Sequence, residues 1–511
     1  MTTNSENNKR IAKNTLLLYF RTFITLIIAL YTSRVVLQVL GVTDFGIYNV
    51  VGGFVSMFSL ISASLTISTQ RFITFELGRK KNSHPQEIFS TAIIIHFIIA
   101  IIIVILAESI GVWFLNEKMV IDPNRLNAAN WIFQLSLATF IINLISIPYN
   151  SMIIAHEKMT AFAYISLLEA FLKIIIVFML TIITFDKLIV YGILLLVVSI
   201  IIRLIYSIYC SKNFQECHFI FVKEKVYYQQ ILSFSGWNII GSSSGILINY
   251  GLNILLNLFF GVTLNAARGI ATQVDNAVNQ FVSNFTMAIN PQITKSFAAK
   301  DYSYMMSLVM RGSKYSYYLL LIMALPLLFE TDYILKIWLK EVPEYTIIFT
   351  RLSLLYMLCQ SISNTLYTAM LATGKIRNYQ IIVGGISLMA FPITYILFYY
   401  KYPPEYCYYT MLFISISCLI ARLLMLKYMI NLPLITFIRE VLCKIFIVSL
   451  FSSIIPFLIS RNFEESGIRL ITNTLITIII TIFVIYFLGI KKEEKLSILQ
   501  SINTIKRKII N

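Results

Sequence analysis

The residues of this chain that could bind a ligand are charged side chains set inside long apolar segments. Arg21 lies about nine residues into the first apolar run, near the middle of a bilayer at a rise of about 1.5 Å per residue. Three more cations lie within later segments: Arg268, Arg311 and Lys314. A central Arg or Lys costs at least about 2.5–3.5 kcal/mol on insertion scales, so it needs a partner or a function. Because the guanidinium fork matches phosphate oxygens, we predict an anionic substrate. For Arg311 and Lys314, extension to the inner membrane surface is the alternative.

A second set of polar residues follows one face of the segment 264–292. Steps of three and four place them in line on a helix: Arg268, Thr272, Asp275, Asn279, Ser283, Thr286 and Asn290. Asn and Ser hydrogen bonds also hold membrane helices together, at about 0.6–2 kcal/mol each, so helix packing explains single members. An arginine, an aspartate and a run of amides on one face favour a water-filled cavity. Asp275 is its candidate ion-coupling carboxylate, with neutralisation of Arg268 as the alternative.

The sequence shows no residue pattern for a metal site, a cofactor site or a catalytic centre. The six cysteines form no CxxC pair and the four histidines show no ligand spacing, so we expect no metal, no cofactor and no catalytic residue. We interpret the cysteines as small buried hydrophobic residues. The net charge of +17 would suggest nucleic acid in a soluble protein. Here much of the excess lies in short loops and the tail, so it indicates membrane topology, and no nucleic-acid partner is expected.

The elements that must position these residues are transmembrane helices. The chain has 511 residues, of which 58% are hydrophobic and 13% are charged, against about 25% charged in soluble domains. About fourteen segments reach the length of about 20 residues that crosses a bilayer. They are 12–40, 46–77, 88–114, 129–154, 160–184, 188–210, 231–260, 264–292, 304–329, 345–372, 378–400, 407–430, 441–460 and 468–489. We therefore predict an all-α polytopic membrane protein of about 12–14 helices.

Lysine and arginine in the loops predict the orientation. One set of loops, together with both termini, carries most of them, including Arg79, Lys80, Lys81 and the tail residues from Lys491 onward. By the positive-inside rule this set is cytoplasmic. Arg34, Arg203, Arg351 and Arg422 stand near segment ends, where an interfacial position is expected.

The first two segments are predicted to form a tight hairpin, and a sequence similar to that of its turn recurs later in the chain. The turn begins at Leu40-Gly41-Val42-Thr43 and is echoed 220 residues later by Phe260-Gly261-Val262-Thr263. Both first limbs run outward, which indicates two parallel six-helix repeats with a substrate path between them. We predict an N-terminal lobe over 1–215, a C-terminal lobe over 216–440, and two extra helices with a basic tail over 441–511.

Several short segments resemble one known family. They are Leu40–Tyr48, Pro148-Tyr149-Asn150, Asn290-Pro291-Gln292-Ile293, Ile337-Trp338-Leu339 with Val342-Pro343-Glu344-Tyr345, and Ala372-Thr373-Gly374-Lys375. In order and spacing they are similar to polysaccharide and O-antigen flippases of the MOP (multidrug/oligosaccharidyl-lipid/polysaccharide) exporter superfamily. The resemblance implies two six-helix lobes around a central cavity, as in MATE transporters. It also implies that the chain flips an undecaprenyl-diphosphate-linked oligosaccharide from the cytoplasmic to the periplasmic leaflet of the bacterial inner membrane, by alternating access.

This resemblance gives the candidate residues their roles. Arg21 and Arg268 lie in helices where related flippases carry arginines facing the cavity, so the diphosphate would be held by them, with Arg311 or Lys314 assisting. The sugars would lie against the cavity amides Asn249, Asn276, Asn279 and Gln280. The expected partners are the lipid-linked oligosaccharide, membrane lipids, a polysaccharide polymerase and the chain-length machinery.

Three alternatives stay open at this point. A peptidoglycan lipid-precursor flippase and a cation-coupled drug exporter belong to the same superfamily, although a drug pump for cations would need an anionic cavity. An integral-membrane polysaccharide polymerase or glycosyltransferase would need a sizeable outer loop with clustered carboxylates, and the sequence has no such loop.

Overall fold

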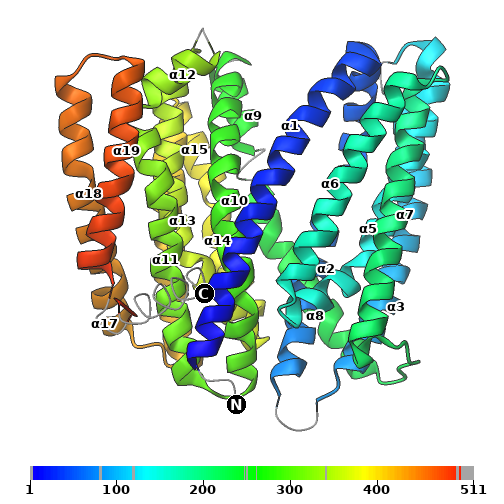
Figure 1. The fold of residues 1–511 in the computed structure, drawn as a ribbon, viewed down its shortest axis with the longest axis horizontal. Coiled ribbons are helices and arrows are strands. Elements are labelled where there is room, and N and C mark those ends of the chain that lie inside the picture. Colours follow the sequence, from blue (N-terminus) through cyan, green and yellow to red (C-terminus); the bar gives the residue numbers. More distant parts are fainter. Residues whose placement is uncertain are drawn as a thin grey trace, which may run out of the picture. The chain divides into compact units, whose positions relative to one another are not determined.

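The structure, a computed structural model, describes residues 4–79, 83–117, 121–246, 248, 251–260, 262–339, 342–490 and 494–495. Within these ranges all regular secondary structure is helical (Figure 1). The chain divides into two compact units, which we describe separately. One comprises Asn14–Ile239, and the other comprises Ile240–Asn511 with Met1–Lys13. The predicted lobe boundaries at 215/216 and 440/441 remain a prediction.

The hairpin predicted for the first two segments has its turn at Gly41. Helix α1 (Asn4–Ser56) is interrupted at Gly41, whose φ of 77° and ψ of 170° are not helical. A positive φ of this size favours glycine, because a Cβ would meet the backbone. The returning limb is itself broken at Met57 and Phe58, a turn that separates α1 from α2 (Ser59–Gly78). The sequence predicts the turn at Gly41 but not this second break.

The first unit is organised around a long helix near its centre. Helix α5 (Leu126–Ala155) packs against α2, α3 (Pro85–Leu106) and α7 (Lys187–Asn213), and α7 also packs against α6 (Met159–Ile182). The remaining elements are η1 (Ala107–Gly111), α4 (Val112–Glu117), η2 (Pro123–Arg125), η3 (Gln215–Cys217) and the first part of α8 (Lys225–Ile246). Buried apolar side chains such as Ile132, Phe133 and Leu180 fill the interfaces.

The second unit has α13 (Thr346–Thr373) at its core. This helix packs against α10 (Val262–Ala298), α11 (Tyr302–Phe329) and α16 (Tyr406–Ile430). Small residues permit the close contacts, since a Cβ on Gly312 of α11 would lie 2.4 Å from Thr365 Cγ2 of α13. The other elements are α9 (Leu252–Phe260), α12 (Thr331–Leu339), α14 (Arg377–Leu388), α15 (Ala390–Tyr399), α17 (Leu434–Phe437), η5 (Ile438–Leu442), α18 (Cys443–Asn462), α19 (Gly467–Val484) and η6 (Ile485–Gly489).

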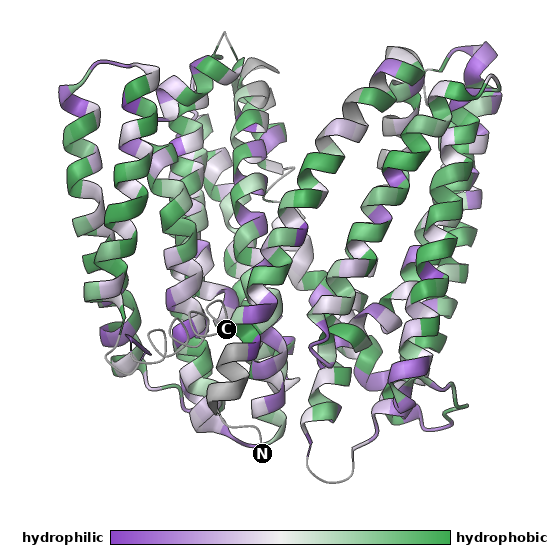
Figure 2. Ribbon diagram, in the orientation of Figure 1, coloured by the Kyte–Doolittle hydropathy of each residue, from purple (hydrophilic) through white to green (hydrophobic). Residues whose placement is uncertain are grey.

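Eleven segments of the described chain are long and apolar enough to span a membrane. They match eleven of the fourteen predicted segments, and the three that do not qualify are 46–77, 231–260 and 264–292. The described parts of those three are helical, and α2, α8 and α10 within them carry many polar residues. Figure 2 shows the contrast with α18 and α19, which are hydrophobic along most of their length. The chain is therefore an all-α, multi-pass membrane protein.

The last two helices pack together and against α11. A buried polar cluster joins them: Glu330, just after α11, accepts from Arg469 Nη2 at 2.9 Å and from Asn473 Nδ2 at 2.5 Å. The Glu330 side chain is fully buried and that of Arg469 is 9% exposed. A more exposed ion pair, Lys336 Nζ to Glu465 Oε2 at 2.6 Å, joins α12 to the loop between α18 and α19.

Candidate functional site

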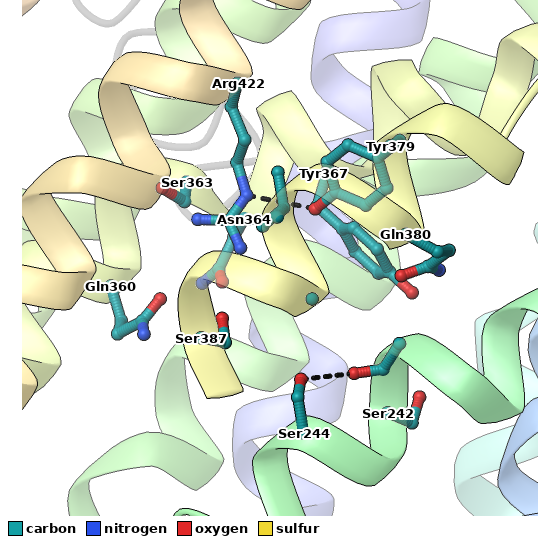
Figure 3. A pocket seen from close by; sticks show the side chains of 13 residues that line it. Ser242, Ser244, Gln360, Ser363, Asn364, Tyr367, Tyr379, Gln380, Ser387 and Arg422 are labelled. Carbon is teal, nitrogen blue, oxygen red and sulfur yellow. Dashed lines mark hydrogen bonds between the residues drawn. The ribbon is translucent and has the colours of Figure 1, made fainter. Parts of the chain in front are cut away.

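A polar pocket of about 250 Å³ lies inside the second unit (Figure 3). Four helices line it, namely α8, α13, α14 and α16. Its polar lining consists of hydroxyls, amides, two tyrosines and one cation: Ser242, Ser244, Gln360, Ser363, Asn364, Tyr367, Tyr379, Gln380, Ser387 and Arg422. Among the described residues that line it there is no carboxylate. The pocket is therefore rich in hydrogen-bonding groups and carries one positive charge.

Glycine brings two of these helices together at the pocket wall. A Cβ on Gly241 of α8 would lie 1.7 Å from Gln380 Oε1 of α14, so any larger residue would displace that amide. Gly384, one turn further along α14, would place a Cβ 3.6 Å from the Cα of Gly241. The close approach of α8 and α14 therefore depends on the absence of a side chain at position 241.

Arg422 is the charged group of this pocket. Its Nε donates to the Tyr379 hydroxyl at 3.0 Å, and Figure 3 shows the side chain extending from α16 toward Tyr379 and Asn364. Its Nη1 is buried and has no hydrogen-bond partner in the described part of the chain. An unpaired buried N–H of a charged group is costly, so this atom is available to a bound anion. The sequence predicts an interfacial position for Arg422, which stays a prediction, and the structure adds that its side chain lines this pocket.

The predicted polar face of α10 is partly packed and partly open. Arg268 is 3% exposed and donates to Asn253 Oδ1 at 3.2 Å and to the Ile248 carbonyl at 3.4 Å. At the other end, Asn290 Oδ1 accepts from Thr368 at 2.8 Å, which ties α10 to α13. Helix packing therefore accounts for the two ends of the stripe.

The polar side chains in the middle of α10 are mostly exposed rather than packed against other helices. Asn276, Asn279 and Gln280 are exposed. Asp275 is partly buried beside Ser353 and within electrostatic reach of Arg268, and its Oδ1 has no hydrogen-bond partner in the described chain. The structure thus brings Asp275 and Arg268 together on α10. Asn249 and Gly261, which the sequence analysis singles out, lie outside the described residues.

The two predicted cations of α11 already have an anionic partner. Lys314, which is 2% exposed, pairs through Nζ with Glu494 Oε2 at 2.9 Å, and Arg311 Nε lies 3.3 Å from Glu494 Oε1. Glu494 comes from the chain beyond η6. A phosphate ligand at Arg311 and Lys314 would therefore have to displace this carboxylate.

Arg21 lies in the first unit. Its guanidinium carbon is 4.7 Å from the centre of the Phe162 ring, an arrangement that stabilises a cation through the ring quadrupole. Its Nε is buried without a hydrogen-bond partner in the described chain, and no ion pair joins it to a described carboxylate. Nearby on α6, Glu169 and Lys173 form the predicted pair, with Nζ to Oε1 at 2.7 Å.

The polar pocket is the part of the site that the sequence analysis misses. Its residues come from four helices spread over positions 241 to 422, and no short motif joins them. One signal was present: Gln360, Ser363, Asn364 and Tyr367 follow steps of three and four on one face of α13, within a segment that is apolar enough on average to span a membrane.

Solved structures with the same fold are transporters. The chain matches a MATE transporter in the bent conformation with a TM-score of 0.73 and 13% identity, covering 86% of this chain and 100% of that one. It matches the bent form of the Vibrio cholerae MATE transporter VcmN with a TM-score of 0.68 and 17% identity, over 84% and 98% of the two chains. A MOP superfamily transporter from Pyrococcus furiosus, described as having a binding pocket of reversed polarity, matches with a TM-score of 0.69 and 13% identity, over 83% and 96%. The fold is thus that of MATE-type transporters of the MOP superfamily.

The sequence family of the chain is more specific than its fold. Residues 11–297, more than half of the chain, match the model of the polysaccharide biosynthesis protein family. The chain belongs to that family, and the resemblance noted in the sequence is confirmed. A search of the curated proteins gives no match.

Proposed function

We propose that this protein is a flippase that moves an undecaprenyl-diphosphate-linked oligosaccharide, the repeat unit of an O-antigen, capsule or exopolysaccharide, from the cytoplasmic to the periplasmic leaflet. The observation that carries the proposal is the combination of a polysaccharide biosynthesis family with a transporter fold. A chain that both serves polysaccharide synthesis and has the fold of exporters is best suited to moving a polysaccharide precursor. We infer alternating access from the same fold, and a transporter rather than an enzyme.

In this proposal the diphosphate is held by Arg21 and Arg268. Neither side chain forms an ion pair with a carboxylate in the described chain, so each keeps donors for an anion. Charge-assisted hydrogen bonds gain strength where the dielectric is low, which suits a diphosphate inside a membrane. Arg311 and Lys314 join the site if Glu494 moves away. The amides Asn249, Asn276, Asn279 and Gln280 contact the sugars.

The orientation and the partners complete the proposal. From the lysine and arginine distribution we infer that both termini are cytoplasmic. The resemblance to polysaccharide flippases implies that the membrane is the inner membrane of a bacterial cell. A single cysteine at exposed Asn124, in a background without other reactive thiols, should then react with an impermeant reagent added from outside. The polymerase and the chain-length machinery would take up the flipped repeat units.

Complementation of a flippase-deficient strain tests the arginines. Arg21→Ala and Arg268→Ala should each abolish polysaccharide export at normal membrane abundance, and the lysine variants should restore it only in part, because the charge returns without the planar fork. If either arginine is only structural, alanine should instead lower abundance or thermal stability. Full export by the Arg21→Ala, Arg268→Ala double variant would remove both from the mechanism.

A further inference from the structure

The pocket around Arg422 has the dimensions of a site for one small polar molecule. Sites for drug-sized ligands measure about 300–1,000 Å³. At about 250 Å³ this pocket is smaller than that range, and it accommodates one sugar ring rather than an oligosaccharide. It lies wholly within the second unit, so its walls do not depend on how the two units are placed.

Several polar groups in the wall are free to bind a ligand. The hydroxyls of Ser242 and Ser363 and the side-chain amide of Asn364 make no hydrogen bond in the described part of the chain. Together they offer both donors and acceptors, which is what the hydroxyls of a sugar require. The ring of Tyr367 adds an apolar surface beside them, as aromatic residues do in sites for partly apolar ligands.

The positive charge of Arg422 favours an anionic ligand in this pocket. Three other cations of this unit have carboxylate partners: Lys314 pairs with Glu494, Arg351 with Asp332, and Arg469 with Glu330. Arg422 has only the Tyr379 hydroxyl on Nε, and its Nη1 is buried and unpartnered in the described chain. A single uncompensated guanidinium matches one carboxylate through two parallel hydrogen bonds.

We propose that this pocket binds one sugar unit carrying a carboxylate, a hexuronic acid, with Arg422 on the carboxylate and Ser242, Ser363 and Asn364 on the ring hydroxyls. The inference rests on the proposed function, since the sugar would be part of the oligosaccharide that is moved. It narrows the substrate to acidic oligosaccharides. A diphosphate fits less well, because it would bring at least two negative charges to one guanidinium.

Direct binding to the full-length protein in detergent tests this inference without transport. Methyl β-D-glucuronide should bind at least about tenfold more tightly than methyl β-D-glucoside, a ratio within reach of one charge-assisted bidentate contact. Acetate at the same concentration should stabilise the protein less than the glucuronide does, because it leaves the hydroxyl and amide groups unused. Calorimetry and the shift of the thermal unfolding midpoint give both comparisons.

Two variants test whether the sugar binds in the Arg422 pocket. Arg422→Gln should abolish the preference for the glucuronide, whereas Lys427→Gln, which removes an exposed charge from the same helix outside the pocket, should preserve it. If Arg422→Gln does not fold, Asn364→Leu keeps the guanidinium and should weaken both sugars. Equal binding of glucuronide and glucoside, or acetate matching the glucuronide as expected for a small-anion site, overturns the proposal. Binding without flipping would refute the proposed function alone, and flipping without binding would refute this inference alone.

Discussion

Cations within this protein differ in whether a carboxylate lies against them. Lys314 and Arg469 are held by Glu494 and Glu330, so their positive charges are already balanced. Arg21, Arg268 and Arg422 rest instead on an aromatic ring, an amide and a tyrosine hydroxyl. Neutral contacts stabilise a buried guanidinium without removing its attraction for anions. The second group is therefore where substrate charges are expected to bind.

Asp275 is predicted to couple transport to an ion gradient. It lies partly buried on the otherwise exposed middle of α10, where a carboxylate can exchange a proton or sodium ion as access alternates. Asp275→Asn should abolish the part of transport driven by a proton or sodium gradient, measured in vesicles with imposed gradients. Asp301→Asn, which keeps a capping side chain at the start of α11, is the control. Unchanged gradient dependence in Asp275→Asn would show that the carboxylate only neutralises Arg268.

A charge cluster outside the spanning segments predicts a pH dependence. Arg125 donates to Asp44, next to the Gly41 turn, at 2.9 Å and to Asp186 at 2.6 Å. The hydrogen bond from Arg125 holds the pKa of the Asp186 carboxyl below its usual value. A lowered folded-state pKa contributes stability above the unfolded pKa of about 3.9, and this contribution is lost as the pH falls through the folded value.

Asp186→Asn isolates that charge, because Asn also caps helices and Asp186 caps α7. At pH 7 the variant should be less stable than the natural protein by less than about 1 kcal/mol, as expected of a partly exposed pair. The difference should shrink to nothing as the pH falls below about 4. Thermal unfolding in detergent over a pH series measures it. A difference that stays constant with pH would mean that the carboxylate charge contributes nothing.

At the scale of elements, the contact between the last two helices and α11 depends on a buried ion pair. Glu330→Ala would leave Arg469 buried without a carboxylate, and such a loss costs about 3–5 kcal/mol. Glu465→Ala removes an exposed pair between α12 and the loop that joins α18 to α19, and should change stability little. The unfolding midpoints of the two variants in detergent make the comparison. Similar midpoints would show that the buried pair does not hold these helices.

Apolar length predicts the eleven strongly hydrophobic helices, because a bilayer requires that length whatever the helix packs against. The turn at Gly41 follows equally from sequence, since the backbone there needs a positive φ. The break at Met57 and the π-helical turns at the ends of several helices do not follow, because tertiary packing decides them.

The candidate site is predictable only where its residues share one helix. Helical spacing identifies the α10 stripe, and packing then determines that its ends are bonded and its middle is exposed. The Arg422 pocket and the Glu494 contact join residues far apart in the chain, and periodicity within one segment carries no information on such contacts.

We propose that the protein as a whole moves a lipid-linked oligosaccharide between leaflets. The family is one of polysaccharide biosynthesis and the fold is that of transporters. In our proposal Arg21 and Arg268, which have no carboxylate partner in the described chain, hold the phosphates. Drug export, an alternative within the same superfamily, would instead lower the amount of a drug in cells that overproduce the protein.

The most direct measurement follows a defined undecaprenyl-diphosphate oligosaccharide in proteoliposomes that contain the purified protein. A reagent that modifies the sugar only in the outer leaflet reports how much substrate has changed sides. We expect rapid flipping with wild-type protein and only the protein-free rate with the Arg21→Ala, Arg268→Ala double variant. Wild-type protein that leaves the substrate at the protein-free rate, while lowering drug accumulation in cells, would contradict the account.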